Sequence, residues 1–227
     1  MPFEDLPDRL AEVRQRIGEA IRRGGHEQDV RVIAVTKTHG PDAVAAAWNA
    51  GLEDVGENRI QEAVGKMAAG VPPVRWHLIG HLQRNKVKSA DGFFLIHSID
   101  SLRLAETVDA HAIGESRVQP VLVQVNVAGE ESKGGFDAIA LGLAADRLAA
   151  MKGIDVRGVM TMAPLDASRE TLEQVFAGAR QARSGLVGAG CVNATELSMG
   201  MSGDYEIAVE QGATMIRLGT VLFGGRS

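Results

Sequence analysis

A lysine at the end of an apolar run is the first residue of this sequence that could do chemistry. Residues 30–36, VRVIAVT, are mostly apolar or β-branched and lead directly to Lys37. One interpretation is that Lys37 marks the exit of a strand into solvent, where its aliphatic stem covers apolar surface. The other is an amine at the mouth of a barrel, where partial desolvation lowers the lysine pKa and the neutral amine attacks a carbonyl to form a Schiff base.

Two clusters of glycine and small polar residues near the other end of the chain indicate a phosphate ligand. SMGMSGD, from Ser198 to Asp204, precedes a helical stretch at 205–211, and Gly219-Thr220 is followed by a Gly-Gly pair. Small residues let backbone N–H groups approach a phosphate, and serine hydroxyls add donors. Each cluster alone also fits a tight turn or a helix cap. The two clusters would fall on the seventh and eighth strands of a barrel, the strands at which that fold often binds phosphate, so together they favour a phosphate ligand.

An arginine inside an apolar strand is the third candidate. In MIRLG the strand alternation puts Arg217 on the same side as Met215 and Gly219, which we expect to be the barrel interior. A buried arginine needs a partner, because its charge cannot be titrated away. That partner is either a neighbouring carboxylate in a structural ion pair, or a ring nitrogen or phosphate of a ligand.

The elements that must position these residues follow from the hydrophobic pattern. Apolar residues recur at helical spacing from Leu6 to Ile21, and the helix that they predict ends at Gly24-Gly25. Short apolar runs then alternate with helical stretches rich in Ala, Glu, Gln and Leu. The eight runs are VRVIAVTK from Val30, EDVGEN from Glu53, VRWHLIG from Val74, FFLIHSI from Phe93, PVLVQVNV from Pro120, DVRGVMTMA from Asp155, TELSMGMS from Thr195 and TMIRLGTVLFG from Thr214.

Eight strands that alternate with helices over 227 residues predict an α/β protein, a single (β/α)₈ TIM barrel with an extra N-terminal helix. We expect this one domain to occupy residues 1–227. The alternative is a doubly wound open sheet, which usually carries a glycine-rich turn after its first strand. No G-x-G-x-x-G occurs in the sequence, so the barrel is favoured.

Composition and charge exclude several classes of protein. The chain has 24 Lys+Arg against 29 Asp+Glu, a net charge of −5, whereas a nucleic-acid binder normally has a basic face. No apolar run approaches the roughly 18 residues that cross a bilayer, and the acidic start MPFEDLPDRL does not resemble a signal peptide. Cys191 is the only cysteine, so no internal disulfide is possible. We expect a cytoplasmic protein with no nucleic-acid or membrane partner, and a monomer, because no second domain is evident.

A Schiff-base lysine, a phosphate cup and an arginine near a ring nitrogen together describe a pyridoxal 5′-phosphate site. The sequence resembles the YggS/PROSC family of pyridoxal phosphate homeostasis proteins, relatives of the barrel domain of alanine racemase. The resemblance runs from Ile33 to Arg226 and implies the alanine-racemase type of barrel, PLP fold type III. Its motifs are AVTKT around Lys37, GENRIQE from Gly56, WHLIGHLQRNK from Trp76, HSIDSL from His97, ESKGG from Glu131, LSMGMSGD from Leu197 and IRLGTVLFGGR from Ile216.

The resemblance implies a role for each matched residue. Lys37 would hold the cofactor covalently, Arg217 would face the pyridine nitrogen, and Asn58 and His77 would line the cofactor cavity. Backbone N–H groups would surround the phosphate at Ser198, Gly200, Met201, Ser202, Gly219 and Thr220. No metal site and no catalytic residue are expected.

The sequence departs from the family pattern at one lysine position and matches it at another. His39 stands where family members often carry a second lysine, which puts a role of that lysine in passing on the cofactor in doubt here. Lys133, in ESKGG, matches a family lysine and is either a transient cofactor contact or a solvated loop residue.

Three functions remain open, and the resemblance favours the first. The first is a cofactor carrier in intracellular pyridoxal phosphate homeostasis, with apoenzymes as transient recipients and no substrate turnover. The second is an amino-acid racemase, which needs a second acid–base group. The only tyrosine, Tyr205, lies beside the phosphate cluster and outside any matched catalytic motif. The third is a phosphosugar enzyme on the same barrel with Lys37 as its base.

Overall fold

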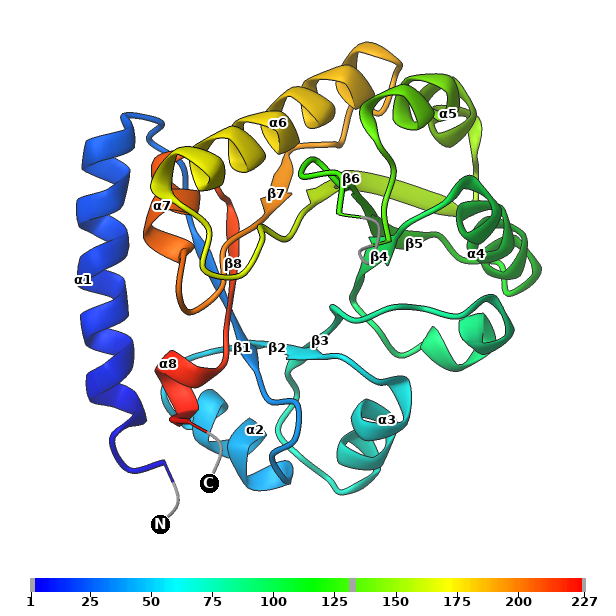
Figure 1. Ribbon diagram of the computed structural model, residues 1–227. Helices are drawn as coiled ribbons and strands as arrows, with labels where there is room; N and C mark the ends of the chain where they lie inside the picture. Colours follow the sequence, from blue (N-terminus) through cyan, green and yellow to red (C-terminus); the bar gives the residue numbers. More distant parts are fainter. Residues whose placement is uncertain (1–2, 131–133, 226–227) are drawn as a thin grey trace.

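Each of the eight predicted runs overlaps one strand. The computed structural model describes residues 3–130 and 134–225, and its strands pair in parallel and in chain order, with the last closing on the first. The predicted TIM barrel is therefore confirmed (Figure 1). The strands are β1 (Arg31–Val35), β2 (Asp54–Glu57), β3 (Arg75–Leu78), β4 (Leu95–Ile99), β5 (Gln119–Gln124), β6 (Ile154–Met160), β7 (Glu196–Ser198) and β8 (Met215–Leu218).

Helices cover the outside of the barrel between successive strands (Figure 1). Between β3 and β4 the connection is a 3₁₀ helix, η1 (Arg84–Ala90), in place of an α-helix. The α-helices are α1 (Leu6–Gly24), α2 (Pro41–Asn49), α3 (Ile60–Ala68), α4 (Leu102–Gly114), α5 (Ala138–Ala150), α6 (Arg169–Gly188), α7 (Tyr205–Glu210) and α8 (Thr220–Phe223). None of the helices in the described ranges is both long and apolar enough to span a membrane.

The extra helix α1 packs beside α7 and α8, at the edge of the barrel (Figure 1). Its buried stripe contains Leu6, Leu10, Val13 and Ile17, as the periodicity predicts. The helix ends because Gly25 has φ of 66°, a left-handed conformation that favours glycine.

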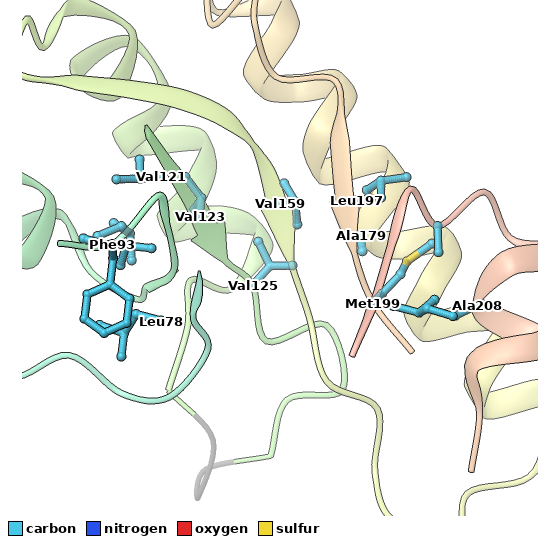
Figure 2. Packing of buried hydrophobic residues seen from close by; sticks show 14 of the residues in the cluster. Leu78, Phe93, Val121, Val123, Val125, Val159, Ala179, Leu197, Met199 and Ala208 are labelled. Carbon is cyan, nitrogen blue, oxygen red and sulfur yellow. The ribbon is translucent and has the colours of Figure 1, made fainter. Parts of the chain in front are cut away.

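The strands bury both of their faces, as expected for a parallel barrel. Outward side chains such as Val121, Val123, Val159 and Leu197 belong to the large core beneath the helices (Figure 2). Inward side chains form a separate apolar cluster inside the barrel, made of Ile33, Leu95, Leu122, Met160 and Met215.

The eighth run differs from the prediction at its end. The apolar sequence continues to Phe223, but β8 ends at Leu218 and the next residues form the short helix α8. Gly219 and Thr220 therefore follow the strand and do not belong to it. The segment TVLF is apolar enough for either element, so the pattern alone does not locate the boundary.

Candidate functional site

A cavity of about 690 Å³ lies at the carboxyl ends of the strands. This is the end of the barrel at which loops of such folds carry function. Seven of the ten predicted site residues line it, namely Lys37, Asn58, Met201, Ser202, Arg217, Gly219 and Thr220. Residues that the sequence did not single out complete the wall, among them Ile79, His81, Asp100, Gln124 and Met162.

Lys37 reaches the cavity through the alternation of β1. Ile33 lies in the interior cluster, and Val35 and Lys37 both line the cavity, so every second residue points inward. Lys37 is half-buried in the turn that follows the strand. In that turn Thr38 has φ of 69°, which turns the chain sharply away from the mouth.

The residue before Lys37 is held by a buried ion pair. Lys66 Nζ, on α3, donates hydrogen bonds to a carboxylate oxygen of Glu57 and, at 2.7 Å, to the carbonyl of Thr36. The Thr36 hydroxyl donates to the same Glu57 oxygen at 2.6 Å. Glu57 and Thr36 are fully buried. The hydroxyl and the carbonyl of Thr36 are therefore both fixed directly beside the site lysine.

Backbone donors gather on the side of the cavity formed by the segments after β7 and β8. Ser202, Gly203, Gly219 and Thr220 all line it. Within residues 3–130 and 134–225, the N–H groups of these four residues donate to no protein acceptor. Four such N–H groups beside one cavity could hold an anion such as a phosphate.

Two neighbouring N–H groups, those of Met201 and Val221, are already used within the protein. Met201 N–H donates to Asp204 Oδ1 at 2.5 Å, and Val221 N–H donates to Ser202 Oγ at 3.3 Å. Gly200 does not line the cavity. It has φ of 94°, and its carbonyl accepts from Arg217 N–H at 2.9 Å, so it shapes the turn that carries Ser202.

Arg217 lies at the floor of the cavity and is only 4% exposed. Its Nη1 donates to Ser198 Oγ at 2.7 Å and its Nη2 to the carbonyl of Thr161 at 2.9 Å. Burial lowers the pKa of Arg217 to about 10, so it stays a cation at pH 7. The structural alternative was an ion pair with a carboxylate, but both hydrogen-bond partners are neutral oxygens.

Ser198 and His77 lie beneath the cavity, and neither lines it. Ser198 is fully buried, and its hydroxyl contacts His97 as well as Arg217. His77, which was expected to line the cofactor cavity, is also fully buried and contacts His97 and Asp54. The position along the strand explains the difference. His77 lies one residue before the end of β3, so its side chain stays below the rim of the barrel.

His39 and Cys191 do not line the cavity. His39 packs edge-on against Phe3, with ring centroids 5.4 Å apart. Lys133 lies outside the described residues. Cys191 is buried, as expected for a small apolar residue. In the ranges that the structure describes, no group of His, Cys, Asp and Glu side chains is arranged to hold a metal ion.

Comparison with known proteins gives one consistent family. The family described as alanine racemase, N-terminal domain, matches residues 9–227. A pyridoxal phosphate homeostasis protein of Aquifex aeolicus is 39% identical over 222 residues, which cover 96% of this chain and 97% of that protein.

Two solved structures extend the comparison. PipY of Synechococcus elongatus, solved with PLP bound, is 38% identical, with a TM-score of 0.86 over 96% of this chain and 100% of that one. Alanine racemase of Clostridium difficile covers all of this chain and 58% of its own, with a TM-score of 0.78 at 14% identity, a likeness of fold alone.

Proposed function

This chain belongs to the family of the alanine racemase N-terminal domain and of the pyridoxal phosphate homeostasis proteins, and on that premise we propose that it binds pyridoxal 5′-phosphate at the mouth of its barrel. Its role is to hold and release the cofactor in pyridoxal phosphate homeostasis. The observation that carries the proposal is the meeting of three groups at one cavity: the amine of Lys37, four unpartnered N–H groups and the buried cation of Arg217.

Each of the three groups suits one part of the cofactor. Lys37 would hold it covalently, the N–H groups of Ser202, Gly203, Gly219 and Thr220 would bind its phosphate, and Arg217 would donate to its ring nitrogen. When bound, pyridoxal phosphate supplies an aldehyde that forms a Schiff base with amines and a ring that withdraws electrons. Asn58 completes the wall.

Two features support a carrier without substrate turnover. A cation beside the pyridine nitrogen disfavours ring protonation and makes the ring a weaker electron sink. Tyr205, the only tyrosine, lines a separate groove next to α1 and not the mouth cavity. The cavity wall does contain one acid–base pair, His81 with Asp100 at 3.0 Å, so racemisation has to be assayed directly.

Reduction with borohydride tests the covalent site. Protein supplied with pyridoxal phosphate is reduced, digested and mapped by mass spectrometry. We expect a pyridoxyl group on Lys37, none at that position in Lys37→Ala, and an unchanged pattern in Lys152→Ala, which removes an exposed lysine. Labelling confined to other lysines, or the same total label in Lys37→Ala, contradicts the proposal.

A racemisation assay separates the carrier from the catalyst. Chiral chromatography of L-alanine or L-serine incubated with loaded protein should show no D-isomer above the level of free cofactor. Racemisation that Lys37→Ala abolishes would establish the racemase in its place. A phosphosugar enzyme would instead bind sugar phosphates and develop no visible chromophore with pyridoxal phosphate.

We further propose that the chain acts as a monomer and passes its cofactor to pyridoxal-phosphate-dependent apoenzymes. Size-exclusion chromatography with light scattering tests the monomer. Loaded protein freed of excess cofactor should restore the activity of a chosen apoenzyme faster than the same amount of Lys37→Ala protein. Equal rates for the two proteins contradict the transfer.

A further inference from the structure

A line of five polar side chains crosses the inside of the barrel from β2 to β8. Asp54 Oδ1 lies 2.8 Å from His77 Nε2, and His77 Nδ1 lies 2.9 Å from His97 Nε2. His97 Nδ1 lies 2.9 Å from Ser198 Oγ, which accepts from Arg217 Nη1 at 2.7 Å. The contact between His97 on β4 and Ser198 on β7 spans the interior from one wall to the other.

The line is closed to solvent along its whole length. His77, His97 and Ser198 are each 0% exposed, Asp54 is 3% exposed and Arg217 is 4% exposed. Buried polar groups are costly unless each of them is hydrogen-bonded. Five such groups in contact, with only the last of them at the cavity, need a reason beyond packing.

With Asp54 ionised and both imidazoles neutral, the bonding order allows one assignment of the protons. An ionised Asp54 can only accept, so His77 carries its proton on Nε2 and presents Nδ1 as an acceptor. His97 must then donate from Nε2, which leaves its own Nδ1 to accept from the Ser198 hydroxyl. Ser198 in turn accepts from Arg217, which can only donate. In each of the four hydrogen bonds, the donor is therefore the residue nearer Arg217 and the acceptor is the residue nearer Asp54.

The charges around the line favour this assignment. Burial alone would raise the pKa of Asp54, but hydrogen bonds from Arg75 and His77 hold it well below its usual range. The pKa of His77 is lowered by burial first and by the charges of Arg31 and Arg75 as well, against the opposing effect of Asp54. Burial also lowers the pKa of His97 well below its usual range, and the nearby cations Arg217 and Arg31 act in the same direction. A carboxylate at one end, a guanidinium at the other and two neutral imidazoles between them give the line its direction.

We propose that Asp54, His77, His97 and Ser198 are positioning residues for Arg217: they form a one-way chain of hydrogen bonds that fixes its guanidinium at the cavity floor and connects it to the carboxylate of Asp54. The chain and the Thr161 carbonyl occupy Nη1 and Nη2, so the plane of the guanidinium is set and its other donors serve a ligand in the cavity. The part of the proposal that concerns the cofactor ring depends on the function proposed above.

The proton assignment is measured on the cofactor-free protein. In ¹⁵N-labelled wild-type protein, the ring nitrogens of His77 and His97 should show the neutral Nε2–H tautomer between about pH 5.5 and 8.5, the range in which an exposed imidazole titrates. A neutral Nδ1–H tautomer at either residue, or titration of His97 inside this range, overturns the chain.

The positioning role is tested by cutting the chain next to Arg217. Ser198→Ala removes the hydroxyl between His97 and Arg217, and Ser198→Thr retains it. Ser98→Ala is the matched control, because Ser98 is a buried serine of β4 whose hydroxyl donates to the carbonyl of Gly80, outside the chain. In cofactor-free Ser198→Ala, His97 should keep the Nε2–H tautomer that His77 imposes, and its Nδ1 resonance should shift because Nδ1 loses the hydrogen bond from the hydroxyl.

On addition of pyridoxal phosphate, Ser198→Ala should bind about tenfold more weakly and with a shifted absorption band, because one hydrogen bond to a charged group is lost. Ser198→Thr and Ser98→Ala should stay within about twofold of wild type. His97→Gln cuts the chain one position further from Arg217 and should shift the band in the same direction, which covers the case in which Ser198→Ala does not fold.

Wild-type affinity and absorption in both Ser198→Ala and His97→Gln overturn the positioning role. Failure of the wild-type protein to bind pyridoxal phosphate would contradict the proposed function instead. The tautomer measurement would still decide whether the chain exists.

Discussion

Glu57 and Lys66 form an ion pair inside the wall of the barrel, directly beside the backbone that carries Lys37. One carboxylate oxygen, Glu57 Oε2, has no hydrogen-bond partner in the described part of the chain. A buried pair of this kind contributes little net stability, but the loss of one member leaves an uncompensated buried charge. The pair contributes to the structure by holding Thr36 in place through hydrogen bonds.

Lys66→Met should destabilise the protein by about 3–5 kcal/mol, because Glu57 would be left buried without its cationic partner. Denaturant unfolding measures the loss. Lys88→Met, at an exposed position of η1, should change the free energy of unfolding by less than about 0.5 kcal/mol. The double variant Lys66→Met/Glu57→Leu should recover most of the loss. A double variant as unstable as Lys66→Met contradicts the explanation by an unpaired charge.

The residues beneath the cavity show what a sequence conceals at this scale. Lys37 and Arg217 could be singled out because each stands in or after an apolar strand, where a charge is conspicuous. The contact of His97 with Ser198 joins positions 101 residues apart. It depends on the register of β4 and β7 across the closed barrel, and no pattern in either segment specifies that register. The only sign of this contact in the sequence was that two successive strands, β3 and β4, each contain a histidine.

At the scale of elements, the segment after β7 is shaped by the conformation of one glycine. Gly200 has φ of 94°, and a Cβ at this position would lie 2.7 Å from the Cβ of Ala208 on α7. Its carbonyl also accepts the N–H of Arg217. The turn at Gly200 is therefore in contact with both β8 and α7. It also leads directly to the N–H groups of Ser202 and Gly203.

Gly200→Ala should cost about 1–3 kcal/mol, because alanine is strained at this φ and its methyl group would meet α7. The same variant should bind pyridoxal phosphate more weakly, since the N–H groups that follow would shift. Gly185→Ala on α6 is the control, because a Cβ there meets no atom within 4 Å. Alanine in a helix is favoured over glycine by up to about 1 kcal/mol, so this control should be equally or more stable. Unchanged stability and affinity in Gly200→Ala would contradict the role of the turn.

The strands and most helices could be predicted because local pattern determines them. Runs buried on both faces mark the strands, and Gly25 marks where α1 ends. Prediction was weakest where one apolar run continues into a second element, as at β8 and α8. It also did not show that the 3₁₀ helix η1 replaces an α-helix after β3, because RNKVKSA has no feature that distinguishes the two.

At the scale of the whole molecule, the two buried histidines make stability depend on pH. Burial lowers the pKa of both His77 and His97, so they stay neutral in the folded protein while histidines of the unfolded chain bind a proton below about pH 6.5. The unfolded state then holds more protons, and stability falls as the pH decreases. Asp54 adds nothing to this slope, because its depressed pKa keeps it ionised, and the unfolded carboxylate is ionised too above about pH 5.

We expect the free energy of unfolding to fall between about pH 6.5 and 5 by about 1.4 kcal/mol per pH unit for each histidine that stays neutral. Denaturant titrations at three pH values measure the slope. His97→Gln should reduce it by about half, and His26→Gln, at an exposed position, should leave it unchanged. Equal slopes in wild-type and His97→Gln protein would contradict the assignment.

Pairing of β1 with β8 closes the barrel, and the candidate site lies across that closure, with Lys37 after β1 and Arg217 within β8. During synthesis Lys37 leaves the ribosome early, whereas the strand with Arg217 and the donors that follow it emerge long afterwards. A nascent chain thus carries Lys37 without the groups that would retain a cofactor. The complete set of groups exists only once β8 has emerged and paired with β1.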